Sequence, residues 1–127
     1  MFYLTKIENG RMNVPEPEFY NVGTTAISAG EAVALSSGVL VKSNTAPTHI
    51  AAVDANGTAK HVPVYRIEKN QVYSVPCAST PSAFVVGAKL AINSDCLQAG
   101  AASDTGILTI VDTLGAKAVG DEILVRF

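Results

Sequence analysis

The chain has 127 residues, nine of them Lys or Arg and eleven Asp or Glu, which gives a net charge of −2. One domain with its own hydrophobic core is expected at this length, no apolar run is long enough to span a membrane, and the near-neutral charge argues against a nucleic-acid surface. Only 16% of residues are charged, whereas 48% are hydrophobic. This low charge predicts surface buried against other subunits; the alternative is a compact β protein rich in small residues.

The first 18 residues differ from the rest of the chain. Met1 to Ile7 can form one strand, and the segment containing Pro15 and Pro17 is extended because each proline restricts its own and the preceding residue. Such a segment is either a flexible terminus or an arm that orders against a partner. We predict an arm over residues 1–18 and a β domain over 19–127. The predicted partner-binding residues are Phe2, Tyr3, Val14, Pro15, Pro17, Phe19 and Tyr20.

A short unit recurs along the chain. Residues 30–40 match residues 87–97 without a gap, and a truncated third copy covers residues 119–125. Each copy has a glycine at its first or second position followed by a short apolar run, and the first two continue into a second run. We therefore predict two superposable hairpins, with the matched residues Val33 and Leu90, and Leu35 and Ile92, in the core.

The remaining segments also predict strands. A strand over 49–53 precedes the turn at 54–57, and residues 61–68 and 71–76 predict a hairpin around Lys69 and Asn70. Two final strands are expected over 107–111 and 122–127. No stretch has the 3.6-residue periodicity of a long helix. We predict an all-β fold, a compact single-domain β-barrel or β-sandwich with an extended N-terminal arm.

The sequence contains few residues that could form a catalytic or metal-binding site. His49 and His61 flank the turn at 54–57, but a metal site on this hairpin would need a third ligand. The acidic pairs Glu16/Glu18 and Asp121/Glu122 are most simply solvated charges. We predict no catalytic residue, no cofactor, no metal site, and therefore no enzymatic activity.

The two cysteines, Cys77 and Cys96, are too few for a disulfide framework. They could pair with each other, but each sits beside apolar residues. Buried free thiols are therefore the favoured interpretation.

The glycine-led strand starts at 29–33, 86–90 and 119–123, together with the arm through Pro15 and Pro17, resemble the small head decoration (cement) proteins of tailed bacteriophages. The resemblance implies a β-rich, often trimeric protein that docks onto the assembled capsid and reinforces it, commonly with an N-terminal arm. The implied partners are the major capsid protein and the chain itself as a homotrimer, with no nucleic acid and no membrane.

The resemblance also implies location in the virion after synthesis in the bacterial host cytoplasm. Consistent with this, the N-terminus lacks the basic and apolar regions of a secretory signal. The alternative is a non-enzymatic β binding module of a phage fibre or surface protein that recognises sugar or peptide. Such a module would cluster exposed aromatic side chains in its loops.

Overall fold

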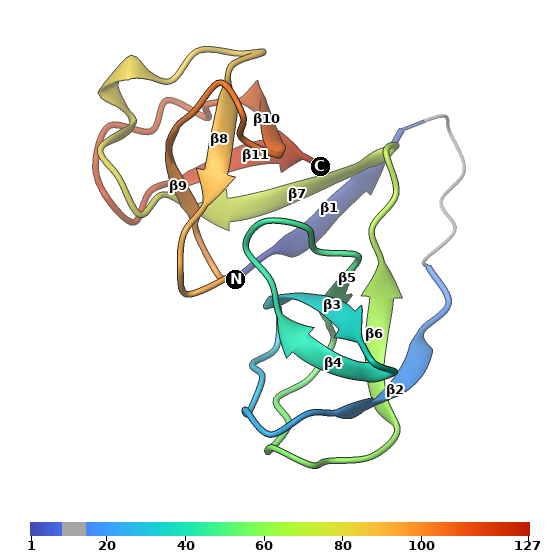
Figure 1. Ribbon diagram of the computed structural model, residues 1–127. Helices are drawn as coiled ribbons and strands as arrows, with labels where there is room; N and C mark the ends of the chain where they lie inside the picture. The colour runs from blue at the N-terminus through green and yellow to red at the C-terminus, as the bar shows by residue number, and fades with distance from the viewer. Residues whose placement is uncertain (9–14) are drawn as a thin grey trace.

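The computed structural model describes residues 1–8 and 15–127, and this part of the chain is all-β, as predicted (Figure 1). The strands are β1 Tyr3–Ile7, β2 Glu18–Val22, β3 Ala32–Ser36, β4 Val39–Lys42, β5 His49–Ala51, β6 Val62–Arg66, β7 Gln71–Pro76, β8 Lys89–Ile92, β9 Ala99–Ala102, β10 Leu108–Asp112 and β11 Glu122–Arg126. The one helical element described is a 3₁₀ turn, η1 Pro81–Ala83. Among the described residues, no helix has the length and apolarity needed to cross a membrane.

The first half of the chain forms a closed five-stranded barrel in the order β2–β4–β3–β5–β6, in the lower part of Figure 1. All neighbours are antiparallel except β2 and β4, which run parallel. Branched side chains fill the barrel because alternate residues of each strand point inward. The buried residues of this core are Val22, Ile27, Val33, Leu40, Ala51, Val62 and Val64.

The second half joins with β1 of the N-terminus to form a six-stranded sheet in the order β1–β7–β11–β10–β8–β9. The sheet curls back on itself, since Cys77, just after β7, makes an isolated parallel bridge with Ala99 of β9. Strand β1 lies outside this curl, antiparallel to β7. The larger core lies mainly against this sheet, with Phe2, Ala32 and Ile50 contributed by the first half of the chain. Its residues from the sheet include Tyr73, Val75, Leu90, Leu108, Ile110, Ile123 and Val125.

The two halves share one topology. We call β2–β6 the first unit and β7–β11 the second unit. Each antiparallel pairing of the first unit has a counterpart in the second: β2–β6 and β7–β11, β3–β4 and β8–β9, β3–β5 and β8–β10, β5–β6 and β10–β11. The parallel contact is also repeated, because Val22 pairs with Leu40 where Cys77 pairs with Ala99.

Backbone hydrogen bonds outside the strands are also equivalent in the two units. The Gly30 amide donates to Ala51 at 2.7 Å, and the Gly87 amide donates to Ile110 at 2.8 Å. Three more backbone hydrogen bonds of the first unit have an equivalent in the second. Written from the donor amide to the acceptor carbonyl, they are Glu31 to Ser28 and Ala88 to Val85; Ser43 to Ala32 and Ser103 to Lys89; and Gly23 to Leu40 and Ala78 to Ala99. The recurrence in the sequence is therefore part of a tandem repeat of a whole five-stranded unit.

The repeated glycines have one structural role. Gly30, Gly87 and Gly120 have φ values of 73°, 88° and 92°, and each begins a strand two residues later. In each turn the residue after the glycine donates its amide to the carbonyl three residues earlier. This is the turn position that requires positive φ, which glycine adopts without steric cost. The predicted glycine turn leading into a strand is confirmed at all three places.

The hairpin prediction is partly confirmed. Both copies are hairpins, and Val33, Leu90 and Ile92 are buried, but Leu35 is 38% exposed. The first hairpin closes through a two-residue turn, so the end of β3 extends past the core. The second hairpin has a longer connection over residues 93–98, which includes Leu97; the equivalent of Leu40 is therefore Ala99.

The predicted hairpin over 61–68 and 71–76 is wrong. Strand β6 belongs to the barrel and β7 to the six-stranded sheet, so they are neighbours in sequence without pairing. Residues 67–70 carry the chain from the first unit to the second. Local alternation predicted both strands correctly, but it contains no information on which strands pair.

The first part of the predicted arm belongs to the fold. Residues 3–7 form β1, and Phe2 is 3% exposed. Its ring packs against Tyr73 and Phe127, with ring centroids 6.4 Å and 5.2 Å away. The prediction of a free arm over residues 1–18 is therefore wrong for residues 2–7. Burial of Phe2 and pairing of β1 with β7 stabilise this segment on the sheet.

The repeat provides a matched test of how the N-terminus is held. A Cβ atom at Gly30 would lie 2.4 Å from Met1 Cβ, whereas a Cβ atom at Gly87 would meet nothing within 4 Å. Alanine in either turn costs about 1–2 kcal/mol of backbone strain. We expect Gly30→Ala to lower the free energy of unfolding by more than Gly87→Ala, because only the former displaces the N-terminal residues. Urea denaturation of both variants measures the difference, and equal losses would contradict it.

Candidate functional site

A groove lies between β1 and the barrel and has a volume of about 390 Å³. The β1 side presents Tyr3 and Leu4, and the barrel side presents Ile50 and Tyr65. Pro15 also lines it. The lining is mostly apolar, as is typical of small-molecule or peptide sites.

The structure separates the predicted partner-binding residues. Phe2, Tyr3 and Pro15 all border the groove, but the Phe2 side chain is a core residue and too buried to serve as a partner contact in the folded protein, which corrects its assignment. Phe19 lies on β2 of the barrel and is 58% exposed. Of the remaining residues, Tyr20 is half-buried on β2, Pro17 is exposed, and Val14 lies outside the described residues.

A polar cluster joins three strands of the barrel around Glu18. Arg66 donates to its carboxylate from Nε at 2.8 Å and from Nη2 at 3.1 Å. The Tyr20 hydroxyl donates at 2.7 Å, and His49 Nε2 lies 3.1 Å from the same carboxylate. The other ring nitrogen of His49 lies 2.8 Å from the Thr48 hydroxyl. The prediction that Glu18 is a simple solvated charge is therefore wrong.

These donors decide the protonation of the carboxylate. The hydrogen bonds from Arg66, then those from Tyr20 and His49, lower the pKa of Glu18 to about 2. In return, the carboxylate raises the pKa of the Tyr20 hydroxyl. A carboxylate so strongly held in its charged form is a weak base. The arrangement therefore suits cross-linking β2, β5 and β6 better than proton transfer.

The two histidines do not form one site. His49 is buried in the Glu18 cluster, whereas His61 is exposed before β6 and donates its backbone amide to the Asn21 side chain. Asp54, at the turn between them, accepts a hydrogen bond from the Ala29 amide. Within residues 1–8 and 15–127, no three His, Cys, Asp or Glu side chains are grouped so as to hold a metal ion.

Both cysteines are buried free thiols, as favoured from the sequence. Burial raises the pKa of the Cys77 thiol and of the Cys96 thiol. Raised pKa values keep the thiols protonated, and a protonated thiol is a poor nucleophile.

The two units differ in whether they bury a charged side chain. In the first unit, Glu31 is fully buried, and its Oε1 lies 2.7 Å from Lys42 Nζ. The Ser28 amide donates to the other oxygen at 2.7 Å. The repeat places Ala88 and Ala102 at the positions of Glu31 and Lys42 in the second unit. The second unit therefore builds the same turn without the ion pair.

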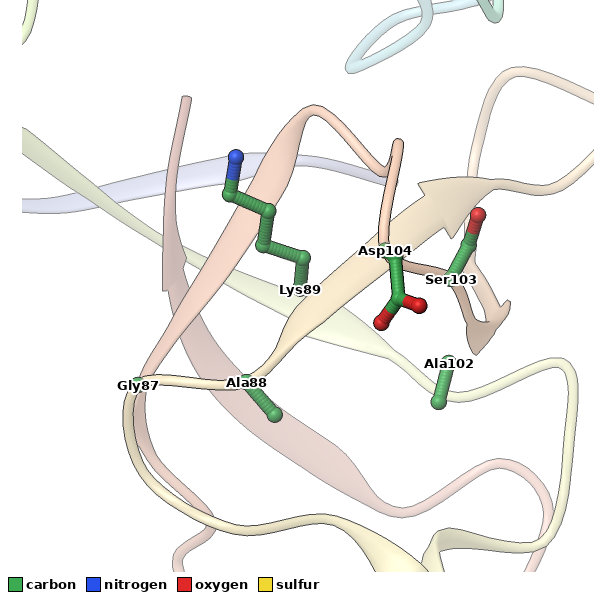
Figure 2. Close-up of a pocket in the computed structure, with 6 residues that line it drawn as sticks. All are labelled: Gly87, Ala88, Lys89, Ala102, Ser103 and Asp104. Atoms are coloured by element: carbon green, nitrogen blue, oxygen red, sulfur yellow. The ribbon is translucent and has the colours of Figure 1, made fainter.

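Those two alanines line a shallow hollow of about 440 Å³. Figure 2 shows Ala88 and Ala102 along it, with Lys89 extending away from the Asp104 carboxylate. The hollow thus occupies the part of the second unit where the first unit has its ion pair. Its charged groups do not converge on one point, so it lacks the geometry of a polar ligand site.

Exposed aliphatic residues gather at one end of the six-stranded sheet. Because β10 runs antiparallel to both β8 and β11, the turns before β8 and before β11 lie at the same end of the sheet as the turn after β10. Their exposed residues are Val85, Val86, Leu114 and Val119. The sequence signal for this patch is a valine immediately before a turn glycine, at Val86 and Val119.

Comparison with known proteins places no relative beside this chain: no family model, no curated protein and no solved structure matches it.

The ion pair of the first unit can be tested against the second unit. We expect Lys42→Ala to lower the free energy of unfolding by about 1–3 kcal/mol, because it leaves the buried Glu31 carboxylate without its cation. The double variant Glu31→Ala/Lys42→Ala reproduces the alanines of the second unit and should recover part of that loss. Denaturant titration of the three proteins checks this. A double variant less stable than Lys42→Ala would contradict the interpretation.

The Glu18 cluster predicts a pH dependence. The pKa of Glu18 is lower in the folded protein than its ordinary value of 4.5, so its contribution is present above that value and is lost as the pH falls toward about 2. Glu18→Gln should be less stable than the wild type at neutral pH, and the difference should shrink over this range. Thermal melts of both proteins at a series of pH values measure it; a constant difference would show that the charge of Glu18 is not the source.

Proposed function

We propose that this chain is a structural virion protein that decorates and stabilises the assembled capsid of a phage or prophage, without enzymatic activity. The observation that carries the proposal is the exposed aliphatic patch of Val85, Val86, Leu114 and Val119 on a duplicated β scaffold. Large apolar side chains gathered at one end of a sheet are typical of a surface that binds protein.

The composition supports the same proposal. With 16% charged residues, the chain carries less charge than soluble monomers usually do, which suits a protein whose surface is covered in an assembly. The proposed partners are the major capsid protein and two further copies of the chain in a homotrimer. Three of the predicted partner-binding residues are exposed and add contacts to these partners: Tyr3, Pro17 and Phe19.

The chemistry of the polar groups also favours a structural role over an enzyme. The most elaborate polar cluster is centred on Glu18, whose charge is neutralised by Arg66. The His49 ring is buried between Thr48 and this carboxylate. A general base needs a pKa near the working pH, and Glu18 is far below it.

The second candidate is a β binding module of a phage fibre or surface protein. The groove between β1 and the barrel favours it, because Tyr3 and Tyr65 contribute aromatic surface to an apolar cavity. Aromatic faces bind sugars and peptides. Unlike the loop aromatics expected of such a module, both tyrosines lie on strands, β1 and β6.

The test is attachment to particles. Phage particles from cells that encode the chain are purified on a density gradient, and mass spectrometry measures its ratio to the major shell subunit. We expect a fixed ratio. Shells stripped of the protein should bind the purified chain again, and their melting temperature should rise because the protein binds only the intact shell.

The same preparation tests the oligomeric state and the alternative. Light scattering of the purified chain should give the mass of a trimer. A chain that stays in the soluble fraction, with no rebinding to stripped shells, would overturn the capsid proposal. Recovery with fibre proteins instead of shells would favour the binding module.

A further inference from the structure

The repeat shows that one of two equivalent turns is already covered by an extended peptide. In the first unit, the Phe2 amide donates to the Gly30 carbonyl at 2.8 Å. Met1 lies directly over the glycine, since a Cβ atom built there would be 2.4 Å from Met1 Cβ. Gly30 is consequently buried. The chain's own N-terminus is therefore the occupant of this turn.

The equivalent turn of the second unit is open. Gly87 is exposed, and a Cβ atom built on it would meet nothing within 4 Å. Its amide makes the same hydrogen bond as that of Gly30, to Ile110. Within the part of the chain that the structure describes, its carbonyl accepts no backbone hydrogen bond of the kind that Phe2 makes. The acceptor is thus in place without a donor.

The side chains around the open turn are also more apolar. Ser28 and Ala29 of the first unit correspond to Val85 and Val86, which are 63% and 66% exposed. Two adjacent valines on an exposed turn lose contact with water only if something covers them. The covered turn has small residues and the uncovered turn has large apolar ones, so the open site has more apolar surface to bury.

We propose that the turn Val85–Ala88 binds an extended apolar segment of another protein, in the way that the turn Ser28–Glu31 holds Met1 and Phe2. A backbone amide of the segment donates to the Gly87 carbonyl, and its apolar side chains cover Val85 and Val86. The N-terminus of a second copy is not the occupant, because Phe2 is buried in its own fold. The inference deepens the proposed function: it rests on that function for the identity of the partner, which would be a shell subunit.

The experiment uses the chain's own N-terminal sequence as a surrogate for such a segment. A synthetic peptide corresponding to residues 1–7, amidated at its C-terminus, is added to the ¹⁵N-labelled full-length protein, and amide shifts are followed by NMR. We expect saturable shifts at residues 85–88 and at the neighbouring residues 110 and 111. Val86→Lys should weaken binding about tenfold, since it places a charge in the covered surface.

Two controls make the result specific. Val53→Lys alters an exposed valine of the first unit and should bind the peptide as the wild type does. A peptide with serine in place of its Met, Phe and Leu should not bind. The NMR spectrum of each variant reports directly that it is folded.

Three results would overturn the inference: no saturable shifts, shifts confined to β1 and β7 through strand exchange, or equal affinity of Val86→Lys and the wild type. The titration contains no phage particles, so it tests the peptide site independently of the proposed capsid function. Peptide binding by a protein that is absent from particles would reject the function and retain the site. Particle binding that Val86→Lys leaves unchanged would reject the site and retain the function.

Discussion

The contact on which the architecture depends is the docking of Phe2. Its amide hydrogen-bonds to Gly30 of the first unit, while its ring packs against Tyr73 and Phe127 of the second. Burying a phenylalanine contributes about 1.5–3 kcal/mol. Because one residue contacts both units, this burial stabilises their relative arrangement as well as the sheet. The position of β1 along β7 follows from it (Figure 1). The groove between β1 and the barrel follows from it as well.

The two units show how one backbone plan accommodates different interiors. Equivalent backbone hydrogen bonds are retained at the glycine turns, whereas the side chains that they position have diverged. The first unit pairs the buried carboxylate of Glu31 with the exposed Lys42, and the second has alanines there. Burying a carboxylate costs desolvation free energy, which offsets much of the attraction to its cation, so the pair gives little net stability over apolar residues. The repeated turn geometry therefore does not require the pair, and the second unit shows an apolar solution.

Divergence at the surface has a functional meaning under the proposed role. The first unit carries the polar cluster around Glu18, which cross-links strands β2, β5 and β6. The second unit places exposed aliphatic side chains at the turns of one sheet end. A decoration protein needs a rigid fold and a surface that binds the shell. In a duplicated fold, one unit can supply the rigidity and the other unit the binding surface. The inferred peptide site is a further difference between the units. The glycine turn of the first unit is covered by the chain's own N-terminus, whereas the equivalent turn of the second unit is open.

Much of the local structure could be predicted from the sequence, because it depends on neighbouring residues. Short alternating segments predicted an all-β fold, and the isolated glycines predicted turns leading into strands, since only glycine adopts positive φ freely. The match of residues 30–40 with 87–97 pointed to a recurring hairpin. The apolar neighbours of the two cysteines also predicted their burial correctly.

Strand pairing was decided only by the tertiary structure, because alternation determines which face a residue occupies but not which strand lies beside it. Residues 61–76 therefore predicted a hairpin although β6 and β7 belong to different sheets. Phe2 looked like an exposed contact because its partners, Tyr73 and Phe127, are distant in sequence. Glu18 looked like a solvated charge for the same reason: Arg66 and His49 reach it only when β2, β5 and β6 close the barrel.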